Sequence, residues 1–267
     1  MLKVRLLALV TFIALLIGGV FFVGKEYSKP APIPSPNPPV TTTPPATPPT
    51  ATPPATIPPT TPPPSSGVLT GPIGFVGCSN SRDTVQGYYS IGGKRIWRPL
   101  QNTTYGGGTP VSWFNGLKDS NSKYWKEFDA MNAANPGAKN LWLSLCLRAT
   151  ESDAASYAAS ISVIDEVKRR IPGITIYVSG LNGFVEPHVC GITGKNGPLR
   201  AQMLADRLVG EGRAKTGPDV GDLISDDQIP SDGATPQNTE TISDGCHPSP
   251  ERGEPKLGRE LLKFFPN

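Results

Sequence analysis

A long proline-rich segment limits what this chain can fold into. Residues 30–66 consist almost entirely of Pro, Thr, Ala and Ser, and they hold most of the 31 prolines in the 267-residue chain. Proline lacks a backbone donor and favours the extended polyproline II geometry, so such a segment cannot pack into a core. We therefore expect residues 30–67 to form a disordered, semi-rigid spacer. Residues 68–267 remain for the folding unit, which is a normal size for one domain.

Residues 1–29 have the pattern of a membrane-targeting segment. Lys3 and Arg5 precede an uncharged apolar run of about 18 residues, near the minimum length of a helix that spans a bilayer. No small-x-small cleavage pattern follows the run, and positive charge before it favours a cytoplasmic N-terminus. The sequence predicts a single-pass signal anchor with the domain outside the cell. A cleaved signal peptide, and hence a secreted domain, is the alternative.

Short apolar runs and helical patterns alternate in the remaining chain. Strands are predicted at 73–77, 140–147, 174–178 and 222–225, and helices at 152–173, 121–134, 199–212 and 252–264. Ser152 is a suitable N-cap for the first of these helices. Strand, helix and strand in succession favour an α/β domain with a parallel sheet and helices on both faces. In such sheets the reactive groups gather in loops at the carboxyl ends of the strands.

Polar turns at these predicted strand ends suggest acyl-transfer chemistry. A serine hydroxyl needs a base to become a good nucleophile, and an imidazole with an ordinary pKa of about 6.5 is the usual base near neutral pH. The imidazole in turn needs a carboxylate to hold its tautomer. Asp244 and His247 supply this pair in one short loop, and Ser79 follows the first strand as the candidate nucleophile. The oxyanion needs preorganised donors, for which the backbone N–H of Ser79, a glycine N–H and the side-chain amide of Asn182 are candidates.

Four short sequence blocks resemble those of the SGNH/GDSL hydrolases. These blocks are Gly77-Cys78-Ser79, the Gly107-Gly108-Thr109 stretch, Gly180-Leu181-Asn182-Gly183 and Asp244-Gly-Cys-His247-Pro248. They occur in the family's order, and the resemblance covers the whole globular part of the chain. It implies a three-layer α/β/α flavodoxin-like fold and ester hydrolysis through an acyl-serine, without a metal or another cofactor. The implied oxyanion hole consists of Ser79, Gly107 and Asn182.

The implied substrate is an ester of carbohydrate or lipid, carrying an acyl or acetyl group. Two positions depart from the family's pattern, because Cys78 and Gly183 stand where its blocks usually carry Asp. Any contact that those carboxylates make in the family's site must be lost or replaced here. Neither departure removes a candidate catalytic atom.

Other interpretations of the same residues remain open. A role of Ser79 as a helix cap alone is one alternative, and Ser81 is a rival nucleophile two positions further on. An inactive surface module on the same fold is the alternative function, with Trp97, Trp113 and Trp125 binding glycans. The net charge of only +3 and the scattered positions of the 25 basic residues argue against nucleic acid as a partner.

The four cysteines suit an exported domain and permit two disulfides in three pairings. Cys190 with Cys246 is preferred because both lie in loops on the predicted active edge, whereas Cys146 lies in a strand. Cys78 with Cys246 is the rival pairing, and free buried thiols are a further alternative. His188 and His247 together with Cys190 and Cys246 have the side chains of a zinc site, but their spacing fits poorly, so no metal is predicted. His188 is expected in a loop, exposed or packed.

Overall fold

The computed structural model of the protein describes residues 69–99, 107–225 and 239–267. The chain divides into two units, Met1–Pro59 and Thr60–Asn267, and every described residue belongs to the second. The predicted anchor at 1–29 and the predicted spacer at 30–67 lie outside the described residues, so both stay predictions. Among the described residues, no helix combines the length and the apolar character needed to cross a bilayer.

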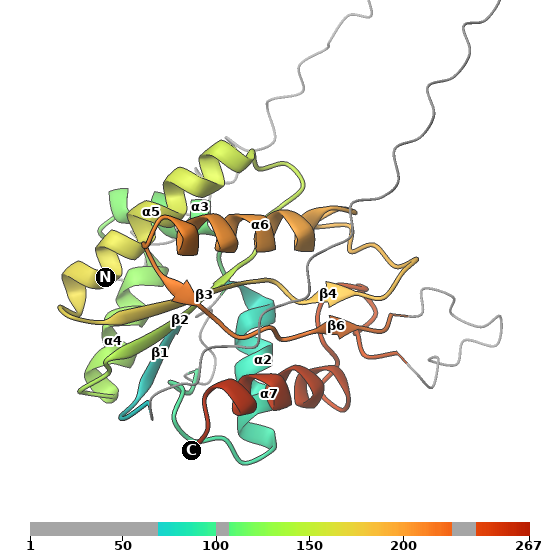
Figure 1. Ribbon diagram of the computed structural model, residues 1–267, viewed down its shortest axis with the longest axis horizontal. Helices are drawn as coiled ribbons and strands as arrows, with labels where there is room; N and C mark the ends of the chain where they lie inside the picture. Colours follow the sequence, from blue (N-terminus) through green and yellow to red (C-terminus); the bar gives the residue numbers. More distant parts are fainter. Residues whose placement is uncertain (1–68, 100–106, 226–238) are drawn as a thin grey trace, which may run out of the picture. The chain divides into compact units, whose positions relative to one another are not determined.

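The described residues form a mixed α/β unit (Figure 1). Its strands are β1 (Ile73–Val76), β2 (Asn140–Leu145), β3 (Thr175–Gly180), β4 (Gly183–Phe184), β5 (Lys215–Thr216) and β6 (Asp222–Leu223). Its helices are α2 (Ser79–Ser90), α3 (Pro110–Asn115), α4 (Lys123–Ala134), α5 (Asp153–Arg170), α6 (Gly197–Gly210) and α7 (Gly253–Phe264), with a 3₁₀ turn at Gly116–Lys118.

The main sheet is parallel throughout and has the strand order β1-β2-β3-β5. One further parallel bridge joins Ile73 to Ile96 beyond the outer edge of β1. There the N–H of Ile73 donates to the Arg95 carbonyl (2.9 Å), and the N–H of Trp97 donates to the Ile73 carbonyl (2.8 Å). With this bridge counted as a second strand, the spatial order is 2-1-3-4-5, which is a common doubly wound arrangement.

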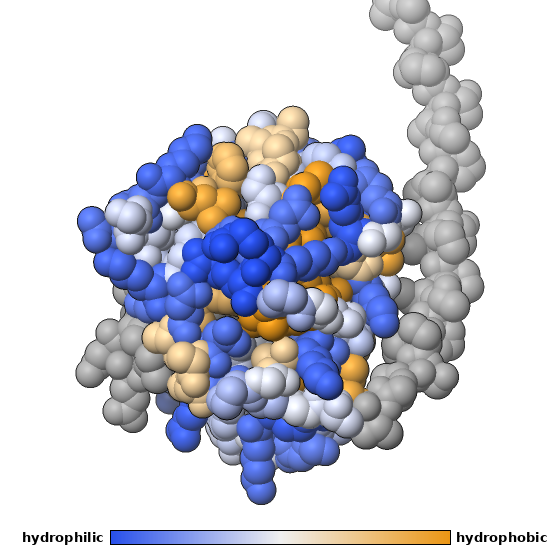
Figure 2. All heavy atoms as spheres, turned by 90° about the vertical axis from the view of Figure 1, so that its left-hand side faces the viewer, coloured by the Kyte–Doolittle hydropathy of each residue, from blue (hydrophilic) through white to orange (hydrophobic). Residues whose placement is uncertain are grey.

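Helices cover both faces of the sheet. Helices α2 and α7 pack together on one side, and α5 and α6 lie on the other, with α3 against α5 (Figure 1). Strands β1 and β2 are buried along their whole length because they are covered from both sides, which explains their continuous apolar runs. The face shown in Figure 2 is largely hydrophilic, with separate apolar patches.

The three main predicted strands and the four predicted helices are confirmed, with ends that differ by a few residues. Ser152 caps α5 as predicted, since its hydroxyl accepts from the N–H of Ala155 (3.2 Å). The strand predicted at 222–225 is shorter and lies outside the main sheet, where β6 pairs with β4. Helices α2 and α3 and strands β4 and β5 were not predicted.

Candidate active site

Ser79 is the first residue of helix α2, directly after the turn that follows strand β1. This turn requires glycine at position 77, because a Cβ there would lie 2.2 Å from the Ser81 hydroxyl oxygen. Cys78 occupies the N-cap position, so the Ser79 side chain is not the cap. Ser81 is only 1% exposed, and its hydroxyl accepts from the N–H of Cys78 (3.1 Å). The structure thus separates the two serines into a partly exposed one and a buried one.

The structure brings Ser79, His247 and Asp244 together in a hydrogen-bonded row. The Ser79 Oγ lies 2.6 Å from His247 Nε2, although the two residues are 168 positions apart. His247 Nδ1 is hydrogen-bonded to Asp244 Oδ2. If Nδ1 carries the proton, then Nε2 is free to accept the serine proton. This is the arrangement that a nucleophile, a base and an orienting acid require.

The Asp244 carboxylate is held by backbone donors of its own loop. Its Oδ1 accepts from the N–H of Cys246 (2.8 Å) and from the N–H of His247 (3.0 Å). Burial alone would raise the pKa of Asp244. The two N–H groups and the His247 ring together lower it by more than burial raises it, so the pKa lies below its ordinary value. The loop can close because Gly245 adopts a φ of 65°, a conformation that favours glycine.

A second carboxylate lies near this row. Asp83 on α2 is 6% exposed and accepts from the Arg82 guanidinium (2.9 and 3.0 Å). Burial raises the pKa of Asp83, whereas the positive charges of Arg82 and His247 oppose that rise. Because it is already paired with Arg82, Asp83 takes no part in the hydrogen-bonded row.

Ser79 and His247 open into a pocket of about 110 Å³ at the carboxyl edge of the main sheet. Residues just after three strands line this pocket, in agreement with the expectation that reactive groups gather at the carboxyl ends of parallel strands. They are Cys78 after β1, Cys146, Leu147 and Arg148 after β2, and Leu181 after β3. The loop before α6 adds Ile192 and Thr193. Sequence reasoning did not single out Arg148, Ile192 or Thr193, because they belong to no recognisable block.

The two other candidates for the oxyanion hole are placed differently. Gly107 lines the pocket next to Ser79. Asn182 is 2% exposed and does not line the pocket: its Oδ1 accepts from Asn80 Nδ2 (3.3 Å), and its own Nδ2 donates to the Gly183 carbonyl (3.3 Å). A contact of Asn182 with substrate therefore stays a prediction.

Position 183 requires glycine, because the side chain of Asp222 occupies the space that a Cβ would need. A Cβ at Gly183 would lie 1.9 Å from the Asp222 Oδ1 on the neighbouring strand β6. The Asp that the family's pattern carries at this position would therefore not fit here. In its place, a carboxylate from a different strand lies beside the Asn182 turn.

Two disulfides flank the row, one on each side. Cys190 is bonded to Cys246, the preferred pairing, and Cys78 is bonded to Cys146. The first bond lies beside His247 and the second beside Ser79 in sequence. Cys146 follows the last residue of β2, so it is free to reach the turn after β1. Since both bonds use their thiols, Cys190 and Cys246 offer no thiolate to a metal, and the described residues contain no cluster of metal-binding side chains.

The three tryptophans considered for glycan binding belong to the core. Trp97 and Trp113 are fully buried, and Trp125 is 4% exposed. The Trp113 indole donates to the Gly77 carbonyl (3.0 Å), and the Trp125 indole donates to the Trp113 carbonyl (3.0 Å). Trp113 therefore supports the turn before Ser79, and Trp125 supports Trp113. None of the three side chains is exposed enough for a sugar ring to stack on it.

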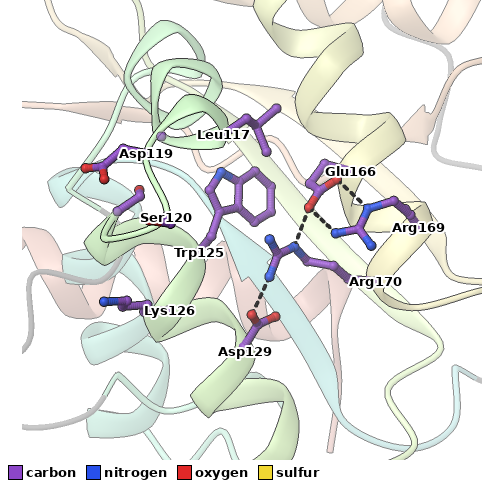
Figure 3. A pocket seen from close by; sticks show the side chains of 11 residues that line it. Leu117, Asp119, Ser120, Trp125, Lys126, Asp129, Glu166, Arg169 and Arg170 are labelled. Carbon is purple, nitrogen blue, oxygen red and sulfur yellow. Dashed lines mark hydrogen bonds and ion pairs between the residues drawn. The ribbon is translucent and has the colours of Figure 1, made fainter.

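A second pocket of about 390 Å³ lies between α4 and α5 (Figure 3). Its charged side chains pair with one another: Glu166 binds both Arg169 and Arg170, and Arg170 also binds Asp129. The Arg170 guanidinium lies 4.7 Å from the Trp125 ring centroid. This pocket is larger than the one at Ser79, but it holds no serine and histidine in contact, so we place the candidate active site in the smaller pocket.

No protein-family model and no curated protein matches the chain. Two solved structures are similar, a family two carbohydrate esterase from Clostridium thermocellum in complex with cellohexaose and an active-site mutant of such an esterase from the same organism. Both are 14% identical and cover 74% of this chain, with TM-scores of 0.37 and 0.38. The chain spans only 64% of their length, and similarity at this level assigns neither activity nor substrate.

Proposed function

We propose that the protein is an SGNH/GDSL-type serine esterase, with Ser79 as nucleophile, His247 as general base and Asp244 as the orienting acid. The single observation that carries the proposal is the row from Ser79 Oγ through the His247 ring to the Asp244 carboxylate, open to a pocket. A flavodoxin-like α/β/α fold is part of the same proposal. The strand order that includes the Ile96 bridge supports it.

The reaction proceeds in two acyl transfers. The Ser79 oxygen attacks the ester carbonyl carbon as its proton passes to His247 Nε2, and the carbonyl oxygen becomes an oxyanion. When the carbon–oxygen bond to the leaving alcohol breaks, His247 returns that proton to the alkoxide. Water then attacks the acyl-serine, again with His247 as the base, and releases the carboxylic acid and free Ser79.

The oxyanion would be stabilised at the start of helix α2. The first N–H groups of a helix have no partner within the helix and lie at the positive end of its dipole. Ser79 is the first residue of α2, so its backbone N–H is a suitable donor. The N–H of Gly107 at the pocket wall and the amide of Asn182 complete the proposed oxyanion hole.

The size of the pocket favours a short acyl group. Pockets that enclose drug-sized ligands usually have about 300–1,000 Å³, whereas this one has about 110 Å³. We propose an acetyl or similarly short acyl ester of a carbohydrate or lipid alcohol, with the alcohol part outside the pocket. Residues 1–29 would anchor the protein in the cell membrane, and the spacer would hold the domain outside.

A fluorophosphonate probe tests the nucleophile and the reaction class together. We expect the purified full-length protein to react with the probe and to release nitrophenol from nitrophenyl acetate, and Ser79→Ala to abolish both. Ser81→Ala is the matched control on the same helix and should keep the label. Labelling that persists in Ser79→Ala, or a wild-type protein that hydrolyses no ester in a broad panel, would sink the proposal.

A further inference from the structure

In the loop that carries Asp244 and His247, two consecutive peptide groups donate their N–H groups to the same oxygen, Asp244 Oδ1. One peptide joins Gly245 to Cys246, and the next joins Cys246 to His247. The N–H of each donates to Asp244 Oδ1, at 2.8 and 3.0 Å. In a planar trans peptide the C=O points away from the N–H, so whatever fixes the carbonyl also fixes the direction of the N–H.

A buried histidine holds the first carbonyl. His188 follows the short strand β4, is 8% exposed, and has its ring packed against the edge of Phe184 at a centroid distance of 5.1 Å. Its Nε2 is hydrogen-bonded to the Gly245 carbonyl oxygen. A carbonyl can only accept, so His188 Nε2 carries the hydrogen and donates it.

An amide side chain holds the second carbonyl. Asn80 follows Ser79 on α2, is 5% exposed, and donates from Nδ2 to the Cys246 carbonyl (3.0 Å). The same Nδ2 lies 3.3 Å from the Asn182 Oδ1, which fixes the orientation of the amide. Both carbonyls behind the Asp244 carboxylate are thus held by side-chain donors from other parts of the chain.

We propose that His188 is a positioning residue for the esterase reaction, with Asn80 as its counterpart on the next peptide. By holding the Gly245 carbonyl, His188 directs the Cys246 N–H at Asp244 and so keeps the carboxylate aligned with the His247 ring. This inference rests on the proposed function. Without the His188 donor, the peptide after Gly245 keeps the bond from its N–H to Asp244 but loses the bond at its carbonyl. It can then rotate more easily, because the preceding glycine tolerates conformations closed to other residues.

The Cys190–Cys246 disulfide does not replace this contact. It joins the same two segments, since Cys190 lies two residues after His188 and Cys246 one residue after Gly245. A disulfide fixes the distance between side chains but leaves the peptide before Cys246 free to turn. The hydrogen bond from His188 acts on that peptide directly, so the two links have separate effects.

Three substitutions at position 188 separate a positioning role from simple packing. His188→Gln keeps an N–H donor near the place of Nε2, His188→Asn is one methylene shorter and cannot reach Gly245, and His188→Phe keeps the ring without a donor. We expect His188→Gln to keep kcat for nitrophenyl acetate within about threefold. The Asn and Phe variants should lose about 10- to 100-fold in kcat, the cost of a small misalignment of reacting groups, with KM nearly unchanged.

A spectroscopic readout accompanies the kinetics. The chain has two histidines, so in all three variants every imidazole signal belongs to His247. The low-field proton resonance of the His247 Nδ1–H, shared with Asp244, should persist in the Gln variant and disappear in the Asn and Phe variants. All measurements use the full-length protein, and thermal melting is recorded for each variant.

Several results would overturn the proposal. Wild-type kcat in the Asn and Phe variants, or an equal loss of kcat in the Gln variant, would show that the donor at position 188 does not matter. Loss of folding in the Asn and Phe variants would make the contact a requirement of the fold instead. If the wild-type protein hydrolyses no ester, the proposed function fails, whereas the low-field proton still tests the role of His188 alone.

Discussion

Ser79 and His247 meet at one hydrogen bond, yet the two residues are held in different ways. Ser79 lies at the junction of a buried strand and a 12-residue helix, so regular backbone hydrogen bonds fix its position. His247 lies in a loop outside any helix or strand. Two backbone hydrogen bonds close that loop, from the N–H of Ile242 to the His247 carbonyl and from the N–H of Gly245 to the Ile242 carbonyl (both 2.9 Å). Side chains supply its other contacts: Asp244 from within, and His188, Asn80 and Cys190 from elsewhere.

The difference shows where this site is most sensitive to change. Many backbone hydrogen bonds hold a residue at the junction of a strand and a helix. The loss of one side-chain contact therefore changes the position of such a residue little. The loop of His247 has fewer backbone hydrogen bonds than a strand and a helix, so each side-chain contact carries a larger share. We therefore expect the histidine side of the site to respond to single substitutions more strongly than the serine side.

The largest effect on the histidine side is expected from Asp244→Asn. The amide preserves the shape of the side chain but removes the negative charge and disturbs the His247 tautomer, so kcat should fall by about 10³- to 10⁴-fold. The rate of fluorophosphonate labelling should fall in parallel. Thermal melting serves as the control for folding, and a loss below tenfold in a folded variant would contradict the role of Asp244.

Removal of each disulfide in turn tests the serine side and the histidine side of the site separately. They close loops of similar length, 68 and 56 residues, so removal of either should cost a similar free energy of unfolding, about 2–4 kcal/mol. Their effects on activity should differ. Cys190→Ala/Cys246→Ala should lower kcat by about 10- to 100-fold, whereas Cys78→Ala/Cys146→Ala should keep kcat within about threefold because α2 still holds Ser79.

Denaturant unfolding and nitrophenyl acetate kinetics at the same temperature measure both quantities. The temperature is chosen so that both double variants are folded. An equal loss of kcat in the two double variants would remove the contrast between a nucleophile held by a helix and a base held by a loop.

A smaller effect, on stability rather than activity, is expected for Glu254. This residue lies on α7, which packs against the nucleophile helix α2. Burial, followed by the charge of Asp83, raises the pKa of Glu254 to about 7. The folded state therefore binds this proton more tightly than the unfolded state, and stability falls as pH rises from about 4.5 to about 7. Glu254→Gln should add about 1–2 kcal/mol of stability at pH 8, a figure reduced for the partial exposure of the side chain, and nothing at pH 4.

Denaturant midpoints across this pH range measure the change. If the gain were the same at pH 4 and pH 8, ionisation of Glu254 would not be its cause.

The smallest effect is expected at the second pocket. Arg170→Gln removes the ion pairs with Glu166 and Asp129 and the contact with Trp125, and should lower stability by about 1 kcal/mol. Esterase activity should not change. A clear drop in kcat/KM in the folded variant would mean that this pocket takes part in the reaction.

The pattern of apolar residues was sufficient to predict strands β1, β2 and β3 and helices α4 to α7. Helix α2 was missed because its sequence, SNSRDTVQGYYS, contains Ser, Asn, Asp and Gly and lacks an apolar stripe. It forms because it packs closely against α7: a Cβ at Gly87 would lie 1.8 Å from the Glu254 carbonyl oxygen, so only glycine permits this approach. Strand β5 was missed because it has two exposed residues, Lys215 and Thr216.

The sequence by itself determined which chemical groups the site can use. Ser79, Asp244 and His247 stand in short blocks next to predicted strand ends, and local spacing is enough to recognise them. Only the tertiary structure decided how these groups are held. The bonds from His188 to Gly245 and from Asn80 to Cys246 span 57 and 166 positions, and the contacts of side chains so distant in sequence depend on how the whole sheet and its loops close. No local pattern records them.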